Sequence, residues 1–155
     1  MSPASLPTRC EHEEPHAVQF SVFLTNRIGQ LKELLNLFSE ESVEVLGLSV
    51  VDSTDWAVIR VVMSDPGKAR EVLHRHGTPF TESNVLLTQL DSANSLSEIC
   101  ELLLRAEISI HFAYPLTVRS NDRAVMVLHV DDNVLAADVL TRHKIVLLGH
   151  EDLSR

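Results

Sequence analysis

Hydrophobic and polar residues alternate at two different periods in the first part of this chain. From Val18 to Thr25 every second position is apolar, which is the period of a strand with one buried face. The next apolar residues are spaced by three and four, so they share one stripe of a helix predicted from about Gly29 to Glu41: Leu31, Leu34, Leu35 and Phe38. The pattern therefore predicts a strand followed by a helix.

A hairpin and a second helix come next. Residues 43–51 and 56–63 are rich in β-branched side chains, and the polar residues 52–55 between them have turn composition. Asp65 and Pro66 are typical of a helix start, and Gly77 can adopt the left-handed conformation that ends a helix. A short return strand is expected at 79–82, which gives the order β-α-β-β-α-β.

The same pattern then recurs. A shift of 65 places carries the first helical stripe onto Leu96, Ile99, Cys100 and Leu103. A shift of 67 places matches eight identical residues between 57 and 76, among them Asp65 with Asp132 and His76 with His143. The difference of two between these shifts predicts that the hairpin turn of the second repeat, around 120–123, is two residues longer than that of the first. The chain is a duplication.

We predict an α+β fold of two ferredoxin-like β-α-β-β-α-β units, each a four-stranded antiparallel sheet with two helices on one face. The expected division is a flexible tail over 1–15, a first unit over 16–83 and a second over 84–155, joined near Ser83. Both central strands carry apolar residues on both faces, so the second face should be covered by the sister unit or by another chain.

Composition and charge limit the classes of molecule that the chain is expected to bind. Thirteen basic against twenty-two acidic residues give a net charge of −9, which disfavours nucleic acid and anionic membranes. No run of 18 apolar residues indicates a membrane span, and the N-terminus lacks the layout of a signal peptide. With only two cysteines, Cys10 and Cys100, a disulfide framework is not indicated, and a cytoplasmic location is expected.

The chain lacks the sequence signatures of an enzyme or of a metal site. No nucleophile elbow, phosphate-binding loop or dinucleotide fingerprint is present, and the adjacent Asp131 and Asp132 have the position of helix caps. Cys10, His12 and His16 could hold a transition metal with a fourth ligand, but their spacing is not that of a closed zinc site. We expect no catalytic activity, no cofactor and no bound metal.

A strand ending at Thr25, then Asn26-Arg27-Ile28-Gly29-Gln30-Leu31 opening a helix, then a strand entered through Ser42-Val43-Glu44-Val45, resembles the ACT domain. That family's pattern is Asn-x-Pro-Gly-x-Leu followed, past the helix, by Gly-Val-Asn-Ile. Residues 17–150 resemble a tandem of two such domains. The resemblance implies a regulatory, non-catalytic module that binds a small molecule, usually an amino acid, at an interface between two units beside the first strand–helix loop.

The resemblance also implies the ligand-binding residues. In the first repeat these are Asn26, Arg27, Ile28, Gly29, Gln30, Leu31, Glu44 and Val45. A weaker second site comprises Asp91, Ser92, Asn94, Ser95 and Ser109. Ile28 and Asn94 depart from the pattern, since they replace its proline and its glycine, and Glu44 stands where amino-acid-binding relatives often carry Asn.

The chemistry of the first loop is consistent with that implication. Gly29 opens a helix, whose free N–H groups suit a carboxylate and whose missing side chain allows close approach. Asn26 and Glu44 could accept hydrogen bonds from an ammonium group, if Glu44 points toward the loop. An ordinary turn and helix start would explain Asn26 and Gly29 equally well.

Three functions follow as hypotheses. The first is a sensor that binds an amino acid at the first loop and associates as a homodimer. The second is a regulatory subunit that docks a metabolic enzyme through sheet edges and apolar faces, without a ligand of its own. An enzyme on this frame is the third reading, because fold does not dictate function.

Overall fold

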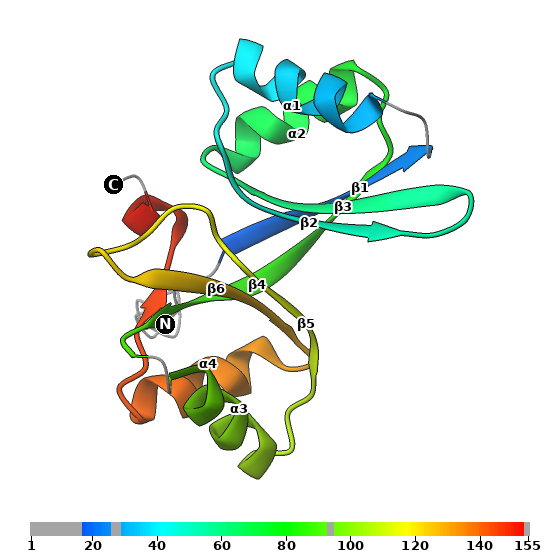
Figure 1. Cartoon of the computed structure of the whole chain (residues 1–155). Helices are drawn as coiled ribbons and strands as arrows, with labels where there is room; N and C mark the ends of the chain where they lie inside the picture. The colour runs from blue at the N-terminus through cyan, green and yellow to red at the C-terminus, as the bar shows by residue number, and fades with distance from the viewer. Residues whose placement is uncertain (1–16, 26–28, 93–94, 154–155) are drawn as a thin grey trace, which may run out of the picture.

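The computed structural model describes residues 17–25, 29–92 and 95–153. The first half of the chain forms one β-α-β-β-α-β unit (Figure 1). Its elements are β1 (Ala17–Thr25), α1 (Gln30–Glu40), β2 (Val45–Asp52), β3 (Trp56–Met63), α2 (Pro66–Arg75) and β4 (Phe80–Leu90). These bounds agree closely with the hydrophobic periods, except at β4.

The second half repeats the arrangement. Its elements are α3 (Ser95–Arg105), β5 (Ile110–Pro115), β6 (Ala124–Val130), α4 (Asn133–Arg142), β7 (Leu147–Leu148) and a 3-10 turn, η1 (His150–Leu153). The strands are ordered β2-β3-β1-β4 in the first unit and β7-β4-β6-β5 in the second, all antiparallel. The prediction of an α+β fold with two ferredoxin-like units is confirmed.

The strand β4 belongs to both units, which corrects the expected short return strand at 79–82. Its residues up to Val85 pair with β1, and from Leu86 it pairs with β6 and β7. The expected boundary near Ser83 therefore lies inside a continuous strand, which passes from the upper to the lower sheet in Figure 1. Within the described residues, seven strands thus form two four-stranded arrangements that share β4.

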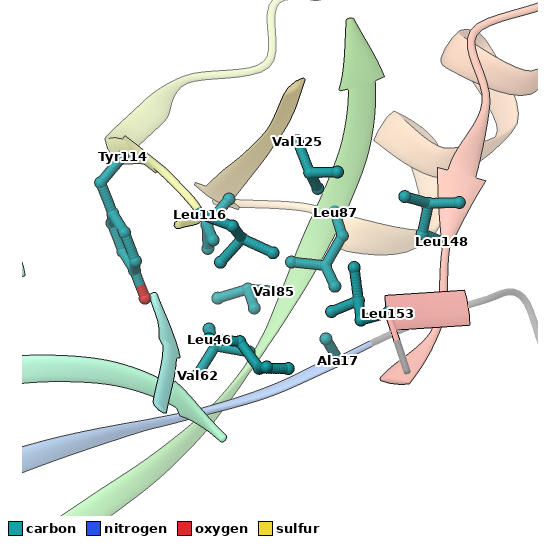
Figure 2. Close-up of a cluster of buried hydrophobic side chains, with 11 residues drawn as sticks. Ala17, Leu46, Val62, Val85, Leu87, Tyr114, Leu116, Val125, Leu148 and Leu153 are labelled. Atoms are coloured by element: carbon teal, nitrogen blue, oxygen red, sulfur yellow. The ribbon is translucent and has the colours of Figure 1, made fainter. Parts of the chain in front are cut away.

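The molecule has four layers, with helices outside and two sheets facing each other (Figure 1). Phe20 and Phe38 belong to the core between the first sheet and α1 and α2, while Leu86 and Leu103 belong to the core between the second sheet and α3 and α4. A third core lies between the sheets, and Figure 2 shows its side chains converging from both units. The predicted cover for the second sheet face is therefore the sister unit.

Equivalent positions in the two units share their backbone conformation. Asp65 and Asp132 cap α2 and α4, each accepting from the backbone N–H three residues later. Left-handed residues follow the paired helices at Ser42 and Glu107 after α1 and α3, and at Gly77 and Lys144 after α2 and α4. The spacing between the members of these pairs is 65 in the first case and 67 in the others, as the sequence repeats predict.

The two units are joined at a bulge in β2. The carbonyl oxygen of Leu46 accepts hydrogen bonds from the backbone N–H of Thr117 at 2.8 Å and from its hydroxyl at 2.9 Å. Beside it, Gly47 forms a bridge with Leu116, and a Cβ on Gly47 would lie 2.3 Å from the Leu116 Cδ2 atom. The missing side chain lets the connection between β5 and β6 lie directly against β2.

Candidate functional site

The first strand–helix loop ends at a left-handed glycine. Gly29 is the N-cap of α1 with φ of 90°, and a Cβ there would meet no atom of the described residues within 4 Å. Because glycine has no side chain, the first N–H groups of α1 receive no side-chain cap from it, whereas α2 and α4 begin with capping aspartates. Asn26, Arg27 and Ile28 lie outside the described residues.

A hollow of about 360 Å³ adjoins this helix start, and we call it the α1 hollow. Its apolar lining comes from Leu24, Leu34 and Leu37, and its polar lining from Gln30, Glu33, His76 and Thr78. The hydroxyl of Thr25, at the end of β1, donates to the Gln30 side-chain oxygen at 3.0 Å. The hollow therefore combines a carboxylate, an amide, a hydroxyl and an imidazole beside an open helix start.

Sequence reasoning identified only Gln30 among these polar residues. Glu33 lies in the first turn of α1, four residues after Gly29, and that spacing could have indicated it. His76 was expected to cap α2, and it occupies the C-cap position while also lining the hollow. Its counterpart His143 has its Nδ1 atom 2.8 Å from the Val139 carbonyl oxygen, which confirms the expected capping contact there.

Glu44 and Val45 lie at the opposite end of the first sheet from Gly29. Thr25 is paired with Trp56 at one end of β3 and Val45 with Met63 at the other. These positions are seven residues apart along β3, or about 23 Å at the usual rise per residue of a strand. Within one chain the Glu44 carboxylate therefore does not face the first loop.

Glu44 and Val45 instead line a separate hollow of about 610 Å³, which we call the β2 hollow. Ser39, Ser42 and Glu44 provide its polar lining. Its apolar lining comes from both units: Leu35, Val43, Val45 and Leu46 from the first and Val118 from the second. The structure thus separates the predicted first-repeat residues into two places.

The equivalent loop of the second unit has its polar groups engaged within the loop. The Ser95 hydroxyl accepts hydrogen bonds from the backbone N–H groups of Asp91 and Ser92, at 3.1 and 2.9 Å. The Asp91 carboxylate receives hydrogen bonds from Gln89 and Arg123, and these two contacts lower its pKa, the Gln89 bond contributing most. Asn94 lies outside the described residues.

Ser109, the remaining residue of the predicted second site, is not part of that loop. Its backbone N–H donates to the Asp131 carboxylate at 3.2 Å, and its carbonyl accepts from the Asp131 N–H. These are the same reciprocal bonds that Glu44 makes with Ser64 in the first unit. Ser109 therefore stabilises the entry to β5, at the far end of its sheet from the loop.

The first sheet extends beyond the area that the second unit covers. Phe23 and Val51 are each paired with Val58, so the three side chains share the face that packs against the second unit further along the strands. Trp56, on the same face, is 52% exposed and Val51 is 42% exposed. In Figure 1 this end of the β2–β3 hairpin projects past the lower sheet. An apolar surface is left open beside the first loop.

Over 17–25, 29–92 and 95–153 no three His, Cys, Asp or Glu side chains are grouped closely enough to hold a metal ion. Cys10, His12 and His16 lie outside these residues. None of the helices in the described part of the chain has the length and apolar character needed to cross a membrane.

The fold defines a class of protein with two ferredoxin-like units packed sheet to sheet. A family model described as an ACT domain pair matches residues 16–155. The chain belongs to this family, as the repeated strand–helix pattern predicts. No curated protein matches it significantly.

Solved structures agree on the fold. Protein BT0572 from Bacteroides thetaiotaomicron is 24% identical, with a TM-score of 0.81, over 90% of this chain and 96% of that one. The ligand-free regulatory subunit of aspartate kinase from Thermus thermophilus is 10% identical, with a TM-score of 0.57, over 84% and 93%. The corresponding subunit from Thermus flavus is 11% identical, with a TM-score of 0.56, over 85% and 93%.

Proposed function

We propose that this ACT domain pair is a non-catalytic regulatory protein that binds an amino acid beside its first strand–helix loop. In this proposal the two units span residues 16–83 and 84–155, and a tail over residues 1–15 precedes them. The observation that carries the proposal is the open, left-handed Gly29 next to the α1 hollow. A carboxylate would bind the N–H groups at the helix start, and an ammonium would bind Glu33 or the Gln30 side-chain oxygen.

The second loop supports this choice by contrast. Ser95, at the position of Gln30, accepts hydrogen bonds from two backbone N–H groups, and Asp91, at the position of Asn26, accepts from Gln89 and Arg123. The Gln30 side-chain oxygen, in comparison, accepts a bond from the exposed hydroxyl of Thr25. A ligand at the second loop would have to displace the bonds made there, which offsets the binding energy it gains. Ligand binding at the second loop is therefore the weaker proposal; its residues are Asp91, Ser92, Asn94 and Ser95.

We also propose a homodimer that completes the site. The open face formed by Phe23, Val51, Trp56 and Val58 lies at the same end of the sheet as Thr25 and the first loop. A second copy covering this face would remove exposed apolar surface from water and would bring further side chains to the loop.

The alternative function, docking of a metabolic enzyme, uses the same surface. The likeness to regulatory subunits of aspartate kinase concerns the fold, and it motivates the test without naming a partner. A complex with an enzyme would bury Trp56 just as a homodimer would. A cytoplasmic location stays a prediction.

The test is a thermal-shift panel of the twenty amino acids on the full chain. One or a few should raise the melting temperature, with dissociation constants between about micromolar and millimolar for a ligand of this size. Gly29→Ala and Glu33→Gln should reduce the shift. Glu98→Gln is the matched control, because Glu98 occupies the position of Glu33 in α3, and it should leave the shift unchanged.

A flat panel would contradict amino-acid binding. In that case sedimentation of the chain alone, and of a Trp56→Lys variant, separates the remaining possibilities. A wild-type dimer that the variant converts to monomer supports self-association. If the wild-type chain is a monomer that pulls down an enzyme, and the Trp56→Lys variant does not pull it down, the result supports docking instead.

A further inference from the structure

The β2 hollow is a second concave site, distinct from the α1 hollow at the other end of the sheet. Its volume of about 610 Å³ is within the range of small-molecule sites. Helix α1 and the start of β2 line it from the first unit, and Val118 lines it from the second. Both units therefore contribute to the lining of the hollow.

The contact between the units fixes the wall of this hollow. The two bonds from Thr117 to the Leu46 carbonyl, at 2.8 and 2.9 Å, hold the residue next to Val118 in place. Leu46 is 2% exposed and Val43 is 3% exposed, so the apolar floor is part of the packed interior. The apolar lining is therefore preformed.

The charge of the hollow is of one sign. Of the residues that the structure describes, no lysine or arginine lines it, and Glu44 supplies a carboxylate at an exposed position. Among the described residues no basic side chain forms an ion pair with Glu44. Together with the net charge of −9, this favours a cation and disfavours a ligand that carries its own carboxylate.

The number of polar side chains in the lining matches the number of N–H donors of an alkylammonium group. An alkylammonium group has three N–H donors, and the hollow offers three side-chain acceptors: Ser39, Ser42 and Glu44. We propose that the β2 hollow binds a small primary aliphatic amine, with its ammonium on these oxygens and its chain against the partly exposed Leu35, Val45 and Val118. This ligand class differs from the zwitterion proposed for the α1 hollow.

The second unit shows that these polar residues are not required by the fold. The positions equivalent to Ser39, Ser42 and Glu44 are Leu104, Glu107 and Ser109. The reciprocal bonds that fix the start of the strand use only the backbone N–H and carbonyl of Glu44, paired with Ser64. A Glu44→Gln variant therefore keeps the local structure and removes only the charge.

The experiment titrates the full, 15N-labelled chain with hexylamine, hexanoate and norleucine, which share a similar alkyl length and differ in charge. Hexylamine should shift the amide signals of Glu44, Val45 and Val118, while hexanoate and norleucine should not. Glu44→Gln should weaken hexylamine binding about three- to tenfold, as expected for one partly exposed charge-assisted contact. Glu107→Gln, at the position equivalent to Ser42 in the second unit, should leave it unchanged.

Equal shifts by norleucine at these amides, or hexylamine binding that survives Glu44→Gln undiminished, would overturn the proposal. The proposal would also be overturned if Glu107→Gln weakened hexylamine binding as much as Glu44→Gln does, because that result would mean that hexylamine is attracted to the acidic protein in general. Gly29→Ala should leave the hexylamine response intact. The outcome is therefore independent of whether an amino acid binds at the α1 hollow.

Discussion

The Tyr114 hydroxyl donates a hydrogen bond of 2.6 Å to the side-chain oxygen of Gln19, and the two residues come from different units. Gln19 is fully buried and Tyr114 is 5% exposed, so neither group has water as an alternative partner. Figure 2 shows the tyrosine reaching from the second unit toward the first across the shared core. One polar contact thus fixes the relative position of two apolar sheet faces.

Removing this hydroxyl should destabilise the protein. Tyr114→Phe leaves the Gln19 oxygen buried without a donor, which we expect to cost about 1–3 kcal/mol of unfolding free energy in urea denaturation. The double variant Tyr114→Phe with Gln19→Met removes both polar groups and should recover most of that loss. Additive losses in the double variant would show that the bond itself contributes little.

Tyr114 also predicts an alkaline stability limit. Burial raises its pKa above the ordinary value of 10. Below about pH 10 both the folded and unfolded states keep the proton, but above it the unfolded state releases its proton first, so stability falls as pH rises toward the folded pKa. Because Tyr114 is the only tyrosine, its ionisation can be followed by absorbance at 295 nm. The stability gap between wild type and Tyr114→Phe should narrow above pH 10.

Gly47 should not tolerate a side chain. In Gly47→Ala the new Cβ would clash with Leu116, whose side chain belongs to the core between the sheets, and we expect a cost of about 1–3 kcal/mol in urea unfolding. Leu116→Ala in the same chain should relieve part of it. Gly67→Ala, in the first turn of α2, is the control. A Cβ on Gly67 would lie 3.6 Å from its nearest neighbour, the Asp65 Oδ1 atom, so this substitution should be neutral or stabilising.

The segment after β7 contributes to the core through Leu153. This residue is 3% exposed and packs with Ala17 and Leu148, while the nearby His150 Nε2 atom accepts a bond from the Val18 N–H at 2.9 Å. Leu153→Ala should cost about 2–4 kcal/mol in denaturant unfolding. Leu104→Ala, where the side chain is 75% exposed, should change stability little. Equal effects would contradict a core role for η1.

Periodicity predicted the helices and most strands because one face of each is buried in a single unit. It missed the length of β4 because Thr81, Glu82, Ser83 and Asn84 are all polar. This part of β4 is the edge of the first sheet, so its polar side chains stay in contact with water, and Glu82 pairs with Arg70 on α2. A polar edge strand and a linker have the same composition, and only pairing with β1 distinguishes them.

The candidate site was predictable only in part. The sequence indicated Gly29 as the residue that opens the first helix, and Gly29 is the N-cap of α1; its left-handed backbone, with φ of 90°, was not predicted. The grouping of Glu44 with Gly29 ignored topology, because β1 and β2 run in the same direction and the end of one lies far from the start of the other. Of the residues that line the β2 hollow, Glu44 and Val45 were among the predicted ligand-binding residues, but the contribution of Val118 was not predictable, since it reaches the hollow only through the packing of the two units.

The contact between the units also predicts sensitivity to mild acid. His129 stacks on Phe112 with ring centroids 4.6 Å apart, Arg60 of the first unit lies 3.9 Å from the Phe112 centroid, and the His111 ring lies 5.4 Å from His129. Burial, and then the charges of His111 and Arg60, lower the pKa of His129 below its ordinary value of 6.5. The ring is therefore held neutral beside a cation.

The direction of the effect follows from proton linkage. As pH falls below about 6.5 the unfolded state binds a proton at His129 before the folded state does, so stability decreases until the folded pKa is reached. His129→Gln should flatten the decline in melting temperature from pH 7 to pH 5. His111→Gln should raise the pKa of His129 in an NMR titration of the imidazole carbons, because it removes a neighbouring charge. An unchanged His129 titration in that variant would show that the charge of His111 does not contribute to the lowered pKa.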